Sequence, residues 1–274
     1  MVSQEQRRRQ LAREKFLRQQ QRRTSARRKA RMRNSVIASV LGVIVIGSVA
    51  LYTTGVLKNN DDKANASSQT TPSASASPSK APDPCAKAAA GSVQKLSWKK
   101  EPAMAIDTSA GYTMKLATTC GDIGIALKTS AAPHTVNSFD FLAAKGFFDH
   151  TKCHRLTTNG IYVLQCGDPT GTGSGGPGYT IPDENLKDKS LKGGVYPAGT
   201  VAMANTGQKH TGGSQFFLVY QDSQLPPSYT PFGTIDAAGM KVLKKIAAAG
   251  ESTGQGDGAP NATVVINKAT VTKS

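Results

Sequence analysis

The sequence predicts a mainly β fold in which antiparallel strands form a closed barrel with two helices capping its ends. Three observations support this prediction. From Tyr112 to the C-terminus, short apolar runs alternate with turns that contain Gly, Asn or Asp. Only two stretches of that region, Pro133–Gly146 and Gly239–Ala249, space their apolar residues as a helix does. The first 84 residues have the composition of a tail, a membrane segment and a linker rather than that of a core.

The barrel is expected to begin with a hairpin. Tyr112–Thr118 alternates apolar and polar residues, residues 119–122 form a turn, and Ile123–Leu127 continues as the second strand. Pro133 then opens a helix that Gly146 closes, because Pro suits the first helical turn and Gly the position after the last. The apolar face of this helix, with Phe139, would plug one end of the barrel.

Four further strands are expected in the middle of the domain. Lys152–Leu156 and Ile161–Cys166 form one pair, and the glycine-rich loop Gly167–Gly178 follows them. Thr200–Ala204 and Gln215–Tyr220 flank a polar loop that contains several glycines, so they form a second pair.

The end of the chain completes the barrel. Thr230–Ile235 reads as a strand, and Gly239–Ala249 follows as a helix with Met240, Leu243 and Ile246 on one face. Val264–Val271 is expected to be the last strand. Many antiparallel strands together with two helices fit a closed barrel whose ends are capped.

Phe216 and Phe217 stand next to each other in an expected strand, so their rings point to opposite faces. One ring would fill the core. The other would form the floor of an exposed apolar pocket, with Asn205 and Gln215 on its rim. This makes the pair a candidate binding site.

The chain has 274 residues and a formal net charge of +16, but the charge is unevenly placed. Residues 1–34 contain thirteen Lys and Arg against Glu5 and Glu14, which accounts for +11 of the total. The basic composition therefore describes a cytoplasmic tail, and we expect no nucleic-acid binding by the folded domain. Contact of the tail with anionic lipid is favoured; contact with RNA is the alternative, and would show steep salt dependence.

Residues 35–57 contain no charged side chain and are long enough to span a bilayer as a helix. The basic tail precedes them directly, so the positive-inside rule places residues 1–34 in the cytoplasm and the rest of the chain outside. A cleaved signal peptide is the competing interpretation, but the basic region and the apolar run are both too long for one. We expect a single-pass protein of the cell membrane that contacts lipid through residues 35–57 and the tail.

Residues 58–84 are rich in Ser, Ala, Pro and Thr and have little apolar bulk, which predicts a disordered linker. Residues 85–111 form a transitional segment with the only tryptophan, Trp98. We expect it to pack across the outside of the barrel. The folded domain itself is expected to span residues 112–274.

Three groups of residues carry a resemblance to a known family. Met203–Asn205 reads MAN and Gly213–Phe217 reads GSQFF. Upstream, His154–Leu156 reads HRL and Gln165–Asp168 reads QCGD. A weaker third group is Pro231–Gly233, which reads PFG. The groups stand in the order expected, within a likeness that runs from about residue 112 to about residue 272.

These motifs closely resemble those of the cyclophilins, the barrel-type peptidyl-prolyl cis-trans isomerases. The resemblance implies an eight-stranded barrel, a monomeric catalytic domain and rotation about the bond that precedes proline in polypeptide substrates. Such rotation has a barrier of about 18–20 kcal/mol, because the C–N bond is partly double. It needs no nucleophile, metal or cofactor, and we expect none.

The resemblance assigns roles to individual residues. Arg155 is the cation that would donate to the imide nitrogen of a twisted bond, Gln165 would hold its guanidinium, and Phe217 would form the floor of the proline slot. The residues expected to bind the substrate are Tyr162, Val163, Ala204, Asn205, Gln215, Leu225 and Tyr229.

This sequence departs from the family pattern near the site. The segment between Arg155 and Gln165 is two residues longer than is usual, so Tyr162 and Val163 are aligned with the family's Phe and Met across that difference. Gln224 stands where the family has a tryptophan. Tyr229 stands where it has a histidine.

Residues 171–176 fit the pattern G-x-G-x-x-G, which can bind the phosphates of a dinucleotide. Such a site needs a helix directly after the glycines, and Pro177 and Gly178 follow instead. A surface loop is therefore the better interpretation.

The chain has four cysteines. An even number outside the membrane favours disulfides. Cys153 and Cys166 flank an expected strand pair, so Cys153–Cys166 with Cys85–Cys120 is preferred among the three possible pairings. A zinc site at Cys153, His154 and Cys166 is the rival, and it is disfavoured because adjacent strand residues point to opposite faces.

Two functions remain open from the sequence. One is a membrane-tethered prolyl isomerase that assists the folding of exported proteins. The other is a non-catalytic module or chaperone that holds proline-bearing segments in the same groove. The presence of Arg155 and Gln165 beside the apolar slot favours the isomerase.

Overall fold

A computed structural model describes residues 82–274, so the expected tail, membrane segment and nearly all of the expected linker lie outside the described residues. Two helices and twelve strands follow in the described part, with one short 3-10 turn, Lys192–Gly194. The helices are α2 (Pro133–Ala144) and α3 (Ala237–Ala248). The strands are β1 (Tyr112–Thr118), β2 (Gly121–Leu127), β3 (Thr151–Lys152), β4 (Arg155–Thr157), β5 (Val163–Cys166), β6 (Val195–Tyr196), β7 (Thr200–Met203), β8 (Phe216–Val219), β9 (Ser223–Gln224), β10 (Pro231–Ile235), β11 (Asp257–Gly258) and β12 (Val265–Lys273).

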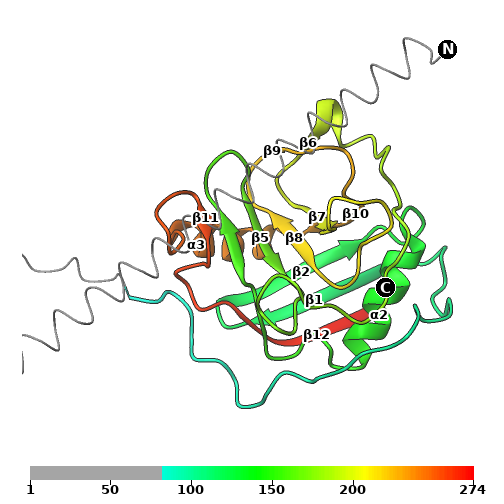
Figure 1. The fold of residues 1–274 in the computed structure, drawn as a ribbon, viewed down its shortest axis with the longest axis horizontal. Helices are drawn as coiled ribbons and strands as arrows, with labels where there is room; N and C mark the ends of the chain where they lie inside the picture. The colour runs from blue at the N-terminus through cyan, green and yellow to red at the C-terminus, as the bar shows by residue number, and fades with distance from the viewer. Residues whose placement is uncertain (1–81) are drawn as a thin grey trace, which may run out of the picture. The chain divides into compact units, whose positions relative to one another are not determined.

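The main sheet is antiparallel and curled (Figure 1). Its strands lie in the order β11-β4-β5-β8-β7-β10-β2-β1-β12-β3, while β6 and β9 form a separate pair. Strands β3 and β4 lie near opposite ends of this order, although only two residues of chain separate them. β3 pairs with β12, and β4 pairs with β5. The mainly β class and the two helices are therefore as expected from the sequence.

The described residues form ten strands in this sheet, not the eight expected. The strand expected at Lys152–Leu156 is divided into β3 and β4, because Cys153 and His154 leave the strand pattern. The additional edge strand β11 has only two residues and carries no apolar run, so periodicity did not reveal it.

The core lies on the concave side of the curled sheet. In β1 the buried residues alternate with exposed ones, which is the pattern of a strand with one solvated face. In β7 and β8 every residue is buried, so these central strands are covered on both faces. Phe216 and Leu218 of β8 point into the main core, while Phe217 and Val219 point into a second, smaller apolar cluster.

Helix α2 fills one end of the sheet with aromatic side chains. Phe139 is fully buried, and its ring lies 4.6 Å from that of Phe232 and 5.5 Å from that of Phe216. The helix begins at Pro133 without a capping side chain of its own. Instead, the distant Glu184 carboxylate accepts hydrogen bonds from the backbone of residues 134 and 135, which satisfies donors that a helix start leaves unpaired.

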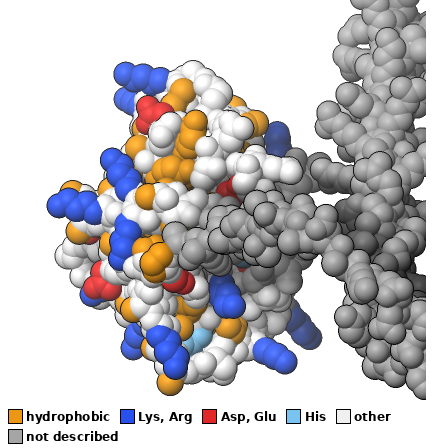
Figure 2. Space-filling view, turned by 90° about the vertical axis from the view of Figure 1, so that its left-hand side faces the viewer, with side chains coloured by type: hydrophobic (Ala, Val, Ile, Leu, Met, Phe, Trp, Pro, Cys, Tyr) orange, Lys and Arg blue, Asp and Glu red, His pale blue; other side chains and the backbone are white. Residues whose placement is uncertain are grey.

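Helix α3 begins two residues before the position expected from the sequence. Asp236 caps it by accepting a hydrogen bond from the Gly239 amide at 2.6 Å, so the first turn starts directly after the aspartate. The helix packs on β2 and buries Leu243 and Ile246. On the side of the domain where α3 lies, basic side chains stand apart among polar and apolar ones (Figure 2).

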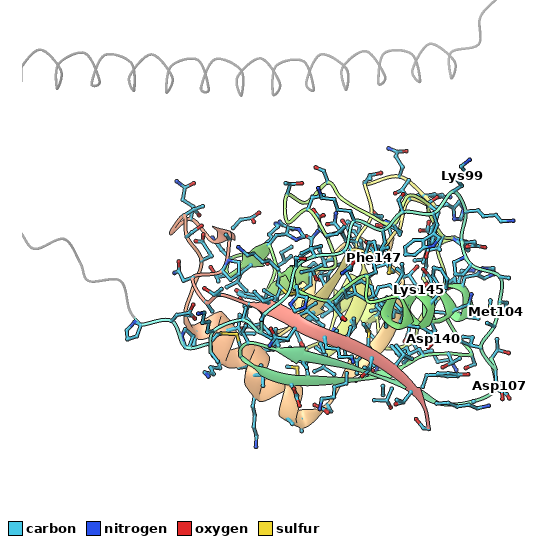
Figure 3. All side chains as sticks on the ribbon, turned by 90° about the horizontal axis from the view of Figure 1, so that it is seen from below. Lys99, Met104, Asp107, Asp140, Lys145 and Phe147 are labelled. Carbon is cyan, nitrogen blue, oxygen red and sulfur yellow. A yellow bond between two sulfur atoms is a disulfide. The ribbon has the colours of Figure 1, made fainter. Side chains whose placement is uncertain are left out.

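Residues 82–111, which we call the N-terminal strap, contain no helix or strand. The strap runs across the outside of the domain, and Figure 3 labels Lys99, Met104 and Asp107 along its course. Trp98 packs edge-on against Phe141 at 5.0 Å. Since the Cys85–Cys120 disulfide holds its beginning to the β1–β2 turn, the strap is part of the folded unit.

No helix in the described part of the chain is long and apolar enough to cross a membrane. The segment for which a membrane span is expected, residues 35–57, lies outside that part. Both disulfides lie in the described part of the chain. They join Cys85 to Cys120 and Cys153 to Cys166, which is the pairing preferred from the sequence.

Candidate active site

Three neighbouring strands place the three expected catalytic side chains in one row. Arg155 of β4 is the register partner of Gln165 of β5, and Gln165 is in turn the partner of Phe217 of β8. Register partners in antiparallel strands project their side chains from the same face. Arg155, Gln165 and Phe217 therefore lie side by side across the outer face of the sheet.

The guanidinium of Arg155 is fixed by a carboxylate that the sequence did not single out. Its Nε donates to Asp257 Oδ1 at 2.7 Å and its Nη2 donates to Oδ2 at 2.8 Å, so the pair is bidentate. The hydrogen bond to Asp257 raises the pKa of Arg155 and lowers the pKa of Asp257. Both groups are therefore charged at neutral pH.

The remaining nitrogen of Arg155 faces a relay of two glutamine side chains. Nη1 donates to Gln165 Oε1 at 3.3 Å, and Gln165 Nε2 donates to Gln215 Oε1 at 2.8 Å. Gln215 Nε2 then donates to the carbonyl oxygen of Gly175 at 2.9 Å. We call the chain Asp257–Arg155–Gln165–Gln215 the polar row. It orients the guanidinium with one edge toward Asp257 and the other toward the sheet.

A separate apolar cluster adjoins the polar row. Phe217 is only 5% exposed, and its ring meets the Tyr229 ring edge to face at 5.4 Å. Tyr196 lies against both rings and donates its hydroxyl to the Tyr229 carbonyl oxygen. Burial raises the pKa of Tyr196 to about 12. The expected slot residues that share this cluster are Val163, Ala204, Phe217, Leu225 and Tyr229.

A groove of about 1050 Å³ opens next to these residues. Four of the expected site residues line it, namely Gln165, Ala204, Asn205 and Gln215. The groove also takes in residues 173–180 of the glycine-rich loop and its continuation. Ala204 belongs both to the groove and to the edge of the apolar cluster, so the two surfaces are continuous there.

Asn205 holds the loop that forms one wall of the groove. Its Nδ2 donates to the Ser228 carbonyl oxygen at 2.8 Å, and its Oδ1 accepts from the Gly207 amide at 3.0 Å. The Ser228 contact joins this loop to the segment that carries Tyr229. Asn205 thus connects the groove wall with the rim of the apolar cluster.

Asp168 fixes the base of the glycine-rich loop. Its carboxylate accepts hydrogen bonds from the amides of Thr170, Thr172 and Gly173. Burial alone would raise the pKa of Asp168, but these hydrogen bonds lower it below its usual value. No helix begins directly after this loop, since the next helical element is the 3-10 turn Lys192–Gly194, which agrees with its interpretation as a surface loop rather than a dinucleotide site.

One expected slot residue lies elsewhere. The ring of Tyr162 packs edge-on against Tyr220 at 5.9 Å and does not join the apolar cluster around Phe217. The reason is alternation along the strand: Val163 and Gln165 face the site, so their neighbours turn to the other face. The role of Tyr162 in binding the substrate stays a prediction, and its ring lies against Tyr220.

The two other departures from the family pattern have visible consequences. Gln224 does not face the cluster with an aromatic ring; its Nε2 donates to the Gly193 carbonyl oxygen at 2.8 Å. Tyr229, in contrast, fills its position with a ring that packs on Phe217. An aromatic ring is therefore kept at position 229, while position 224 provides none.

Sequence reasoning missed Asp257 and Tyr196. Asp257 stands in a glycine-rich segment 102 residues after Arg155, and no local pattern connects the two. Tyr196 lies in the two-residue strand β6, outside every expected element. The presence of an unassigned carboxylate in a loop near the C-terminus was the only available signal for Asp257.

The zinc site considered for Cys153, His154 and Cys166 is excluded by the disulfide between the two cysteines. Within the described residues there is no group of three or more His, Cys, Asp or Glu side chains that could hold a metal ion.

Burial lowers the pKa of His154, whose ring nitrogens have no hydrogen-bond partner in the structure.

The family model described as cyclophilin type peptidyl-prolyl cis-trans isomerase/CLD matches residues 113–271. This match covers more than half of the chain, and the chain belongs to the cyclophilin family. The matched range coincides with the sheet and its two helices, from β1 to β12. The family expected from the sequence motifs is therefore confirmed.

Relatives with the same domain are known from several bacteria. The chain is 52% identical over 165 residues to the "Probable peptidyl-prolyl cis-trans isomerase B" of Mycobacterium leprae (strain TN), over 57% of this chain and 56% of that protein. It is 50% identical to the protein of that name from Mycobacterium tuberculosis (strain ATCC 25618 / H37Rv), over 57% of this chain and 53% of that protein. The match thus spans little more than half the length of these two curated relatives.

A shorter relative is the "Peptidyl-prolyl cis-trans isomerase B" of Bacillus subtilis (strain 168), which is 40% identical over 121 residues, 44% of this chain and 79% of that protein. Among solved structures, a cyclophilin type peptidyl-prolyl cis-trans isomerase of Cryptosporidium parvum aligns with a TM-score of 0.48 and 26% identity, over 60% of this chain and 99% of that one.

Proposed function

We propose that the domain catalyses cis–trans isomerisation of Xaa-Pro bonds in polypeptides. The observation that carries the proposal is the arrangement of Arg155. Asp257 holds two of its nitrogens, and the third donates to Gln165, whose register partner on the next strand is Phe217. The family and the relatives named isomerase support the same activity.

The proline ring of the substrate would rest on the Phe217 ring, against Tyr229 and Leu225. This places the imide nitrogen near Arg155. As the bond twists, the nitrogen regains its lone pair, and Nη1 of Arg155 donates a hydrogen bond to it. A donor fixed in advance stabilises a developing charge more than one that must reorganise, and a preorganised donor of this kind contributes about 10²–10³-fold in rate.

The residues before proline would lie along the groove. Gln215 and the backbone at Asn205 would bind the residue that precedes proline, while the small side chain of Ala204 lets the substrate backbone approach closely. Gln165 would keep the guanidinium in place. The proposed site lies within one chain, so a monomeric catalytic domain suffices.

We further propose that residues 35–57 anchor the protein in the cell membrane, with the basic tail in the cytoplasm and the isomerase domain outside. Support comes from the uncharged run, the +11 tail that precedes it and the two disulfides in the domain. A linker of 27 residues has an average reach of about 30 Å. The domain would then act on exported polypeptides that emerge near the membrane.

A non-catalytic module that holds proline-bearing segments is the second candidate, and the groove of about 1050 Å³ favours it equally. Exchange spectroscopy on an Ala-Pro peptide separates the two. The full chain, purified in a mild detergent, is expected to accelerate cis–trans exchange at substoichiometric concentration. Binding of the peptide without any acceleration would leave the module as the function, and a heat-denatured sample provides the baseline.

A further inference from the structure

The disulfide between Cys153 and Cys166 lies at the proposed catalytic residues. Cys166 directly follows Gln165, and Cys153 stands two residues before Arg155. Both cysteines are buried, with exposed fractions of 4% and 0%. The bond thus joins, beneath the surface of the site, the segment just before β4 to the last residue of β5, and these two strands carry Arg155 and Gln165.

The strand that carries Arg155 has few other constraints. β4 has three residues and pairs with β5 at two positions, Arg155 with Gln165 and Leu156 with Leu164. On its other side β4 meets only β11, which has two residues. A strand this short near a sheet edge is held by a small number of backbone hydrogen bonds, so it opens more readily than a central strand.

The disulfide bridges the place where the strand pattern breaks. If the register of Arg155 with Gln165 continued backwards, Cys153 would face Gly167, but it is bonded to Cys166 instead. Gly167 has a positive φ of 86°, and a Cβ there would collide with the Ser214 carbonyl oxygen. Two features therefore fix this break in the strand register. Gly167 sets the backbone after β5, and the disulfide joins Cys153 to Cys166.

We propose that the Cys153–Cys166 disulfide positions Arg155, by fixing the strand register that sets its guanidinium against Gln165. This inference rests on the proposed isomerase function. The disulfide touches no substrate; it acts through Arg155. Without it, the beginning of β4 shifts more freely, and a displacement of about 1 Å at a reacting group can cost up to about 10²-fold in rate.

The second disulfide provides a matched control. Cys85–Cys120 joins the N-terminal strap to the β1–β2 turn, and none of the residues of the polar row or the apolar cluster is in that turn. The two cysteines are 35 residues apart in sequence, against 13 for Cys153 and Cys166. Because the longer loop restricts the unfolded chain more, removing the control bond is expected to reduce stability at least as much.

The experiment compares C153S/C166S with C85S/C120S in the full chain, well below the unfolding temperature of both. We expect kcat/KM on an Ala-Pro peptide to fall about 3- to 10-fold for C153S/C166S, in kcat rather than KM, and to stay within about 2-fold for C85S/C120S. If C153S/C166S does not fold, C153A/C166V, with apolar side chains suited to the buried site, carries the same test.

A double-mutant cycle distinguishes positioning from general loosening of the fold. When Arg155 is already replaced in R155A, removing the Cys153–Cys166 bond is expected to change the remaining rate by less than about 1.5-fold. Equal losses of kcat/KM in the two disulfide variants, or an undiminished loss in the R155A background, would overturn the inference. A wild-type chain that binds the peptide but does not isomerise it contradicts the proposed function itself, which keeps the two failures apart.

Discussion

The two halves of the candidate site are built in different ways. The apolar cluster around Phe217 stands on β8, which lies between β5 and β7 and is buried on both faces. The polar row includes Arg155 on the short strand β4, and hydrogen bonds between its four side chains hold it together. Packing therefore forms the proline slot, while directional contacts orient the cation.

This difference has a consequence for how the site fails. A change in the apolar cluster leaves a cavity in a well-packed region, so it reduces stability and substrate binding together. A change in the polar row removes a directional contact near the surface, so it reduces the rate while the fold persists. Three variants with their controls test this contrast, and the pH dependence of stability is a further prediction.

The largest expected effect is that of Phe217→Ala. Removing a buried ring costs about 3–5 kcal/mol of unfolding free energy, and the floor of the proline slot disappears with it. Denaturant unfolding measures the first effect, and titration calorimetry with an Ala-Pro peptide measures the second.

Val219→Ala is the matched control, because Val219 is fully buried in the same cluster and on the same strand. It should lose less stability and keep peptide affinity within about 3-fold, since it removes only two methyl groups. If Phe217→Ala bound the peptide as tightly as Val219→Ala, the slot would have to lie elsewhere.

Asp257→Asn is expected to lower kcat/KM about 10-fold, because an amide cannot hold two nitrogens of the guanidinium with charge-assisted hydrogen bonds. Stability should change by no more than about 1 kcal/mol, since the side chain of Asp257 is 55% exposed. Stopped-flow or exchange kinetics and thermal unfolding check the two statements.

Asp122→Asn serves as its control. Asp122 pairs with Lys115 at 2.7 Å, is similarly exposed and lies in the β1–β2 hairpin. The same change of charge there should leave the rate unaltered. A comparable fall in rate for both variants would mean that net charge, rather than the orientation of Arg155, sets the activity.

Gln165→Glu tests the relay inside the polar row. The glutamate still accepts from Arg155, but it cannot donate to Gln215 Oε1 at neutral pH. We expect a loss of about 3- to 5-fold in kcat/KM, which is about 1 kcal/mol and typical of one hydrogen bond. A rate equal to that of the wild type would show that Gln165 and Gln215 need not be joined.

Acid should affect stability through the carboxylates that hold loops. Hydrogen bonds lower the pKa of Asp168 below its ordinary value of 3.8, and the same direction holds for Asp257. A lowered folded-state pKa means that the stabilisation is complete above the unfolded value and is lost as the pH falls through the folded one. Unfolding free energy should therefore be flat from about pH 7 to 5 and decline below about 4.

Asp168→Asn should make the unfolding free energy fall less steeply with decreasing pH. The slope should change by at most about 1.4 kcal/mol per pH unit, which corresponds to the loss of one titrating proton. Chemical denaturation at several pH values measures the slope. An unchanged slope would indicate that Asp168 titrates alike in the folded and unfolded chain.

The sequence predicted the parts of the site that short motifs encode. Gln215 and Phe217 stand within one family motif, and Arg155 and Gln165 belong to another, so the resemblance singled out three members of the polar row and the floor of the slot. Asp257 could not be found in this way, because its partnership with Arg155 depends on β11 closing onto β4. Tertiary contacts between distant loops leave no periodic signal.

The bounds of the strands could not be predicted in full for the same reason, because they too depend on contacts between residues outside one local segment. The expected strand at Lys152–Leu156 is divided because the Cys153–Cys166 bond and the turn at Gly167 impose an irregular step. The direction of the Tyr162 ring could not be predicted, because an alignment across a longer loop does not fix the face to which a residue turns. In each case a contact outside the local window decided the outcome.

The most direct test of the account is the rate of cis–trans exchange of an Ala-Pro peptide with the Arg155→Ala variant, measured at equal occupancy of the wild type and the variant. The account predicts a loss of about 10²–10³-fold in rate with peptide affinity retained within about 3-fold, and an intermediate rate for Arg155→Lys, which keeps the charge without the planar fork. An Arg155→Ala variant that exchanges the bound peptide within about 3-fold of the wild-type rate would contradict the central claim.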